Sequence, residues 1–225
     1  PGALLNEMRI YREAACKGGH DSDSAARLAR DFFCAANQVL DRHFPTRQAS
    51  SHTETVIPRR IFQYWDKPTA PPELEALMQG WANAPGFDYF RLDAAGAVAW
   101  LRRHFDSQHA KAFAAANHVA EASDFLRLCV LFRHGGIYMD SDNKLIGDPN
   151  LLIEDCGPLL LFRDPFGAIP NDVIATIPEH PIIGDALAMA RDALLSREKD
   201  LTWGKTGPGL LTRAVAGYLV GQPDA

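Results

Sequence analysis

Two aspartates, Asp140 and Asp142, are separated by one residue and directly follow the apolar run at residues 137–139. Residues two apart in an extended chain project to the same side, so the two carboxylates point in a similar direction. Carboxylate oxygens at this spacing can hold Mn²⁺ or Mg²⁺, directly or through water, and leave coordination positions for substrate phosphates. The pair therefore predicts a metal site that neutralises a departing nucleotide diphosphate.

The Asp-x-Asp pattern alone has a simpler interpretation, because such carboxylates are often only solvated loop residues. The same tripeptide occurs at residues 21–23, where its polar setting indicates a helix cap. A calcium-binding EF-hand is excluded, because Lys144 and Leu145 stand where that loop needs Asp or Asn and then Gly. The metal-site prediction therefore depends on what surrounds the pair.

Upstream, an apolar helix is predicted over residues 120–134, and it contains Asp124 and Arg127. A spacing of three residues puts both side chains on one face of a helix. The residues around them leave almost no polar face, so we expect the pair to be at least partly buried; an ordinary solvated ion pair is the alternative. Buried charges need partners. In such a pair the carboxylate can accept from sugar hydroxyls and the guanidinium can donate to them.

The composition is that of a globular protein with a sizeable core. The 225 residues are 47% hydrophobic and 23% charged, with a formal net charge of −5. This acidic balance argues against nucleic-acid binding. The cysteines are widely spaced and favour a reducing compartment, with no zinc site expected and a disulfide unsupported; they are Cys16, Cys34, Cys129 and Cys156.

Predicted strands that alternate with predicted helices along the chain indicate an α/β fold with a mostly parallel sheet flanked by helices. The predicted strands are residues 57–65, 88–92, 137–139, 159–162 and 173–176. The predicted helices are residues 73–83, 94–105, 109–133 with a break near Asn117, 182–196 and 208–220. Residues 1–50 are predicted to be an N-terminal helical appendage and linker, and residues 51–225 the main domain.

No apolar run reaches the roughly 18 residues that a transmembrane helix needs. The first residues lack the layout of a signal peptide. We therefore expect a cytoplasmic location, with peripheral membrane association or secretion as an effector left open.

Three segments in register make a more specific pattern: residues 57–65 (IPRRIFQYW), 122–127 (ASDFLR) and 135–142 (GGIYMDSD). Together they resemble the family 32 glycosyltransferases and the wider group with a sugar-binding region containing a DXD motif. That group is similar to capsule-synthesis and initiating mannosyltransferases and to the glucosylating domains of clostridial toxins. The resemblance extends over roughly residues 56–215.

The resemblance implies a GT-A fold and an enzyme that transfers a hexose with retention at the anomeric carbon. It also implies a UDP- or GDP-linked sugar donor, Mn²⁺ or Mg²⁺ as cofactor, and a hydroxyl acceptor on a glycan, lipid or protein. Base, sugar and acceptor are not encoded in these motifs. The relatives usually continue beyond the point where this chain ends with a segment that helps to close the site.

Site roles follow from the resemblance, position by position. Trp65 corresponds to the aromatic residue that stacks on the base, although a core tryptophan at a strand end is the alternative. Ser123 and Asp124 correspond to positions near the ribose and the donor sugar, and Arg127 corresponds to a residue that contacts the donor sugar. Asp140 corresponds to an aspartate that contacts the sugar or ribose and reaches the metal through water. Asp142 corresponds to the direct metal ligand.

Further downstream, Asn171 lies where the family often has an asparagine, and Thr206 and Gly207 match a Thr-Gly-Pro element before a helix. A helix N-terminus suits phosphate, and Lys205 is predicted to add positive charge there. The simpler interpretations are a turn asparagine and an ordinary proline-containing helix start.

Two other functions are alternatives to a glycosyltransferase. A domain that only binds nucleotide-sugars, with a degraded site, would need no catalysis. A haloacid-dehalogenase-like phosphatase also uses Asp-x-Asp after a strand, but there the motif lies near the domain start and Thr or Val follows it. Here Asn143 follows, and about 80 residues of α/β pattern precede it.

Overall fold

The computed structural model describes residues 36, 38–41, 56–154, 156–164 and 167–221. The helical appendage and linker expected over residues 1–50 lie almost wholly outside these residues, so that domain boundary stays a prediction. Cys16, Cys34 and the tripeptide at 21–23 also lie outside them.

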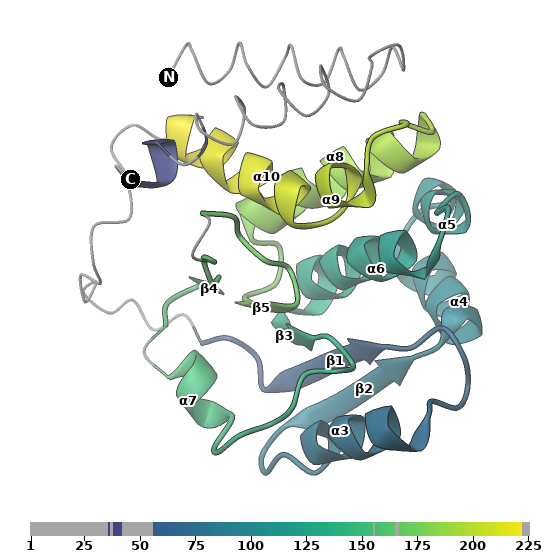
Figure 1. Cartoon of the computed structure of the whole chain (residues 1–225), viewed down its shortest axis with the longest axis vertical. Helices are drawn as coiled ribbons and strands as arrows, with labels where there is room; N and C mark the ends of the chain where they lie inside the picture. Colours follow the sequence, from purple (N-terminus) through teal and green to yellow (C-terminus); the bar gives the residue numbers. More distant parts are fainter. Residues whose placement is uncertain (1–35, 37, 42–55, 155, 165–166, 222–225) are drawn as a thin grey trace.

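One five-stranded sheet forms the middle of the described fold (Figure 1), in the order β2-β1-β3-β5-β4. Strand β1 is parallel to both β2 and β3, whereas β5 is antiparallel to β3 and to β4. Four strands therefore share one direction and β5 runs against them. The bounds are β1 Arg60–Tyr64, β2 Asp88–Leu92, β3 Gly136–Met139, β4 Leu159–Leu160 and β5 Val173–Thr176.

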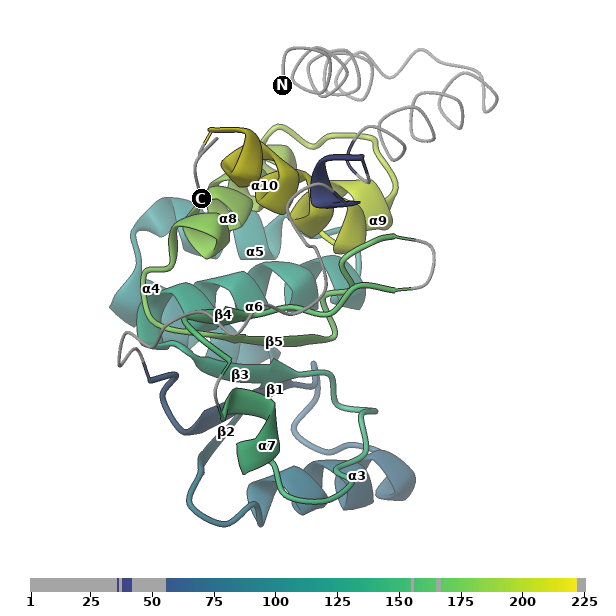
Figure 2. The ribbon, with the colours of Figure 1, turned by 90° about the vertical axis from the view of Figure 1, so that its left-hand side faces the viewer.

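Helices cover both faces of the sheet, and Figure 2 shows the layers from the side. Helices α6, α8 and α10 lie on one side, and α3 and α7 lie on the other (Figure 1). The bounds are α3 Pro72–Ala82, α4 Ala94–His104, α5 Ser107–Ala114, α6 Val119–His134, α7 Asn150–Ile153, α8 Pro181–Leu195, α9 Thr202–Lys205 and α10 Pro208–Gly221.

The strands divide the core in two by the alternation of their side chains. Phe62 and Tyr138 pack in the cluster that contains the apolar residues of α6, α8 and α10. Ile61 and Ile137, one residue earlier in each strand, pack with Trp81 of α3 on the opposite face. The two clusters form because successive side chains of a strand point to opposite faces of the sheet.

The predicted α/β fold and most of the element bounds are confirmed. The break expected near Asn117 separates α5 from α6. Strand β4 is shorter than the predicted 159–162, and the single turns α7 and α9 were not predicted, since four residues carry no helical periodicity.

Two glycines connect α6 to β3. Gly135 ends the helix with φ +60°, and its N–H donates to the carbonyl of Leu131 at 2.8 Å. Gly136 follows with φ +105°, and a Cβ there would lie 2.6 Å from the carbonyl oxygen of Arg60. Only glycine combines these backbone angles with so close an approach of β3 to β1. The pair therefore sets where β3 begins, and with it the position of Asp140.

Replacing Gly136 with alanine is expected to lower the free energy of unfolding by about 2–4 kcal/mol, because strain at positive φ adds to overpacking against β1. Chemical denaturation measures this change. Gly147→Ala is the control, since Gly147 also has positive φ (+87°) but open space around it, and it should cost only about 1 kcal/mol. Equal losses in the two variants would contradict the close-approach argument.

Candidate functional site

The site lies at one edge of the sheet, where β1 and β3 end side by side. Trp65 follows β1 and Asp140 follows β3, and the two strands are parallel. Because β5 runs the other way, its first residues lie at the same edge, and the N–H of Asp140 donates to the carbonyl of Asp172 at 2.9 Å. This reversal is what brings Asn171 to the end of β3.

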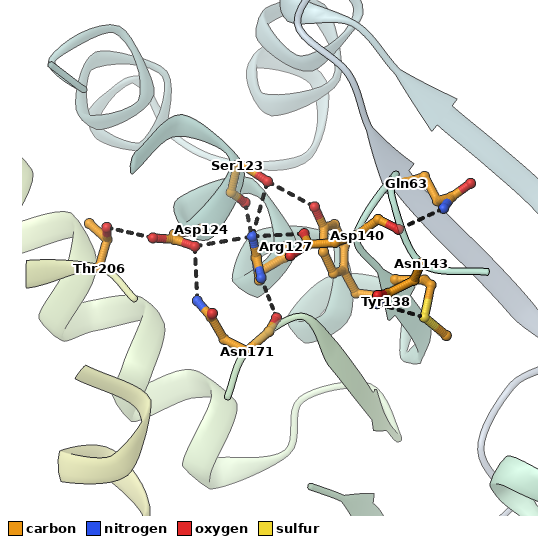
Figure 3. A network of polar contacts seen from close by, with 10 residues as sticks. Gln63, Ser123, Asp124, Arg127, Tyr138, Asp140, Asn143, Asn171 and Thr206 are labelled. Atoms are coloured by element: carbon orange, nitrogen blue, oxygen red, sulfur yellow. Dashed lines mark hydrogen bonds and ion pairs between the residues drawn. The ribbon is translucent and has the colours of Figure 1, made fainter. Parts of the chain in front are cut away.

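Arg127 occupies the centre of a buried polar network (Figure 3). Its side chain reaches from α6, is only 4% exposed, and has Nη2 3.0 Å from Asp124 Oδ1 and 3.1 Å from Asp140 Oδ1. The guanidinium also donates to the Ser123 hydroxyl at 3.1 Å and to the backbone carbonyl of Asn171. One cation thus links two carboxylates from different elements.

Tyr138 completes the surroundings of the guanidinium. The Arg127 carbon Cζ lies 4.5 Å from the centre of the Tyr138 ring, and the tyrosine hydroxyl is 2.8 Å from the Ser123 hydroxyl. Burial alone would lower the pKa of Arg127, but Tyr138 and the nearby carboxylates outweigh it and hold that pKa above its ordinary value. The arginine therefore stays charged.

Asp124 uses both of its carboxylate oxygens inside the network. Oδ1 accepts from the side-chain amide of Asn171 at 2.9 Å, in addition to Arg127, and Oδ2 accepts from the hydroxyl of Thr206 at 2.9 Å. A Cβ on Gly207 would lie 3.4 Å from Oδ2, so the chain after α9 passes close to this carboxylate. An ionised carboxylate has about four acceptor positions, so further donors can still bind.

Asp140 and Asp142 differ strongly in their surroundings. The Asp140 side chain is 31% exposed, and desolvation raises its pKa from 3.8 to about 6. Arg127 opposes this rise, while Asp124, Asp142 and Asp172 add to it. Asp142 is exposed. One carboxylate is thus fixed by the protein and the other faces solvent.

The turn that contains the two aspartates is held from three other elements. Gln63 of β1 donates to the backbone carbonyl of Asp140 at 3.0 Å, and Tyr89 of β2 donates to Gln63 at 2.9 Å. On the other side, the indole N–H of Trp81 in α3 donates to the carbonyl of Asn143 at 2.7 Å. The path of the backbone through the Asp-x-Asp segment is therefore fixed by side chains that the sequence analysis did not identify.

The structure joins six of the predicted site residues in one network and leaves three beside it. The connected residues are Ser123, Asp124, Arg127, Asp140, Asn171 and Thr206. Gly207 adjoins Asp124, and Trp65 and Asp142 lie at the same edge of the sheet. The half-buried Trp65 donates its indole N–H to the carbonyl of Thr69 at 3.2 Å.

The prediction that Lys205 adds positive charge at a phosphate site was wrong. Its side chain is 1% exposed, and its ammonium group lies 3.1 Å from Glu121, so the charge is neutralised inside the protein. Lys205 is therefore not placed to add charge at an exposed phosphate site. This pairing could not be predicted from local sequence patterns, because 84 residues separate the two partners.

Comparison with known proteins gives the same assignment from an independent direction. The model of the family described as "glycosyltransferase sugar-binding region containing DXD motif" matches residues 59–157, under half of the chain. That region includes Trp65, Asp124, Arg127 and both aspartates of the Asp-x-Asp pair. The family match and the site geometry together support a family 32-like glycosyltransferase.

A solved structure supports the fold over a longer stretch. The glycosyltransferase PaToxG is similar to this chain with a TM-score of 0.58 and 21% sequence identity, over 95% of this chain and 81% of that one. No curated protein matches the sequence. At this identity the likeness establishes the GT-A-like fold, and the function rests on the family match.

The donor set of this glycosyltransferase fits a divalent cation such as Mn²⁺ or Mg²⁺. Within the described residues, no group of three or more His, Cys, Asp or Glu side chains forms a complete cage. Asp140 and Asp142 offer hard oxygen ligands beside solvent, which leaves positions for water and phosphate. Mg²⁺ is usually held in this way, by one or two carboxylates plus substrate phosphates.

Asp140 is expected to make the stability of the metal-free protein depend on pH. Its pKa in the folded state, about 6, exceeds the ordinary 3.8, so the folded protein binds more protons between these values. The free energy of unfolding should therefore fall as the pH rises from about 4 to 6, by on the order of 2–3 kcal/mol. Denaturation in chelator-treated buffer measures this, and Asp140→Asn should remove the step. The same pH dependence in both proteins would contradict it.

Proposed function

We propose that this glycosyltransferase is metal-dependent and retaining, and that it moves a hexose from a UDP- or GDP-linked donor to a hydroxyl acceptor. The observation that carries the proposal is the pairing of a fixed and an exposed aspartate at the end of β3. Asp140 is held by Arg127 at 3.1 Å, whereas Asp142 faces solvent next to it. This is the donor set expected for a cation shared between protein and diphosphate.

In this mechanism each polar residue has one task. Asp142 would hold the cation directly and Asp140 would support it through water, while Asp124 and Arg127 orient the hydroxyl groups of the donor sugar. The bound Mn²⁺ or Mg²⁺ would supply Lewis-acid neutralisation of the charge that develops on the diphosphate. Asp124 can accept from a sugar hydroxyl because its partners leave acceptor positions open.

The transfer itself needs no enzyme nucleophile in this scheme. The acceptor hydroxyl attacks the anomeric carbon from the side on which the diphosphate leaves, and a phosphate oxygen takes its proton. Among the described residues, the carboxylates of the network are engaged with Arg127, Asn171 and Thr206. Their contacts suit the positioning of a sugar better than attack on it.

The proposal includes a cytoplasmic location for the protein. In the portion of the chain that the structure describes, none of the helices combines the length and apolar content that crossing a bilayer requires. Cys129 carries a free, buried thiol, and burial raises its pKa well above its ordinary value. A free thiol at Cys129 is consistent with the proposed cytoplasmic location.

Asp142→Asn is expected to reduce metal-stimulated nucleotide release by roughly 100-fold or more, because it removes the direct ligand while leaving the buried network intact. The assay is nucleotide release from a panel of UDP- and GDP-sugars, with Mn²⁺, with Mg²⁺ and with chelator. Asp185→Asn, which changes an exposed carboxylate on α8, is the matched control and should keep full activity.

The panel also separates this proposal from its main competitor. Donor binding that ignores the metal, together with no turnover on any donor, would favour a binding domain with an inactive site. Turnover by Asp142→Asn at the wild-type rate would contradict the metal-ligand role.

Trp65→Ala is expected to raise the dissociation constant for the free nucleotide roughly 10-fold, because base stacking is worth about 1–3 kcal/mol. Isothermal titration with UDP and GDP measures this. Trp65→Phe keeps an aromatic surface and should lose much less. Equal affinity in the alanine variant and the wild type would assign Trp65 a purely structural role.

A further inference from the structure

The N-cap residue of α6 and two side chains of the helix itself contact the segment at residues 202–207, which we call the α9 segment. They are spaced by three residues, so they follow one another along the helix. His118 Nε2 lies 2.6 Å from the Thr202 hydroxyl, and the Glu121 carboxylate lies 3.1 Å from the Lys205 ammonium. Asp124 then accepts from Thr206 at 2.9 Å, and the next residue in the series is Arg127.

The middle contact of this series is a fully buried ion pair. Glu121 is 2% exposed and Lys205 is 1% exposed. Both carboxylate oxygens face the ammonium group, at 3.1 and 3.2 Å, and the backbone N–H of Asn117 donates to one of them at 2.8 Å. Burying two charges is costly, and apolar residues of similar volume would often serve stability as well or better. A contribution to stability alone therefore does not explain why Glu121 and Lys205 are buried as an ion pair.

The α9 segment is also held from its other side and packs tightly. Arg213 of α10 donates to the carbonyl of Gly204 at 2.5 Å. A Cβ on Gly207 would lie 3.2 Å from the Cα of Trp203 and 3.4 Å from Asp124 Oδ2. A shift of the segment would therefore move the groups that contact Asp124.

We propose that Glu121 and Lys205 are positioning residues for donor binding. Their ion pair fixes the α9 segment against α6, so that the Thr206 hydroxyl holds Asp124 in the orientation that the donor sugar meets. Neither residue touches the Asp140–Asp142 pair in the network described above. The inference deepens the proposed function and rests on it for the identity of the ligand.

The first experiment tests the structural half of the proposal without any ligand. Hydrogen exchange of the backbone amides of residues 202–207 is measured in Lys205→Met and Glu121→Gln. Each single variant leaves one buried charge without its partner, so protection should fall at least 10-fold in this segment. Lys111→Met, which changes an exposed lysine on α5, is the control and should leave protection unchanged. Unchanged protection in folded single variants would overturn the proposal.

The second experiment measures donor affinity by calorimetry with UDP-glucose and GDP-mannose in Mn²⁺. For the donor that the wild type binds, each single variant should weaken binding about 10-fold or more. Thr206→Val should weaken it as well, because it removes only the hydroxyl that contacts Asp124. The double variant Glu121→Gln/Lys205→Met leaves no lone charge, so its loss should be smaller than the two single losses combined.

The outcomes separate the two proposals. Wild-type affinity in folded single variants that have lost protection would overturn the positioning role alone. A wild-type chain that binds neither donor, with or without Mn²⁺, would overturn the proposed function and the donor role together. If the single variants fail to fold, the double variant decides: wild-type affinity together with wild-type protection would overturn the proposal.

Discussion

The buried guanidinium of Arg127 is the interaction on which the rest of the site depends. A cation with a side chain only 4% exposed is stable only if anions and dipoles replace the water it has lost. Here Asp124, Asp140 and the carbonyl of Asn171 supply that replacement. Because these residues lie on α6, after β3 and before β5, one charge fixes the relative positions of three parts of the fold.

The direction of β5 has a similar consequence for the site. An open α/β sheet collects its ligand-binding residues at the carboxyl ends of parallel strands. A reversed strand adds the residues before its start to the same edge, and in this chain those residues include Asn171 and Asp172. The site thus combines two strand ends with one strand beginning, and the carbonyls of Asn171 and Asp172, just before β5, accept from Arg127 and from the N–H of Asp140.

Much of this arrangement could be predicted from the sequence, for reasons that are local. The apolar run at residues 137–139, directly after two glycines, located β3, and the apolar surroundings of Asp124 and Arg127 indicated their burial. Contacts that depend on how distant elements pack could not be predicted. Trp81 contacts the turn after Asp142 across 62 residues, and Lys205 finds Glu121 across 84. No periodicity encodes such pairs, so the predicted phosphate-side role of Lys205 was wrong.

In the proposed function, the unequal surroundings of the two aspartates have a physical use. A carboxylate that must bind a cation and then release it gains from being held in place before the ligand arrives, because little ordering remains to be done on binding. Asp140 is held in this way, and the cost is visible in its pKa of about 6. Asp142 keeps the solvent exposure through which a nucleotide-bound cation can enter. Arg127 joins the two requirements: it fixes Asp140 from inside the protein, and it holds Asp124, the carboxylate that we propose meets the donor sugar, beside the same edge of the sheet.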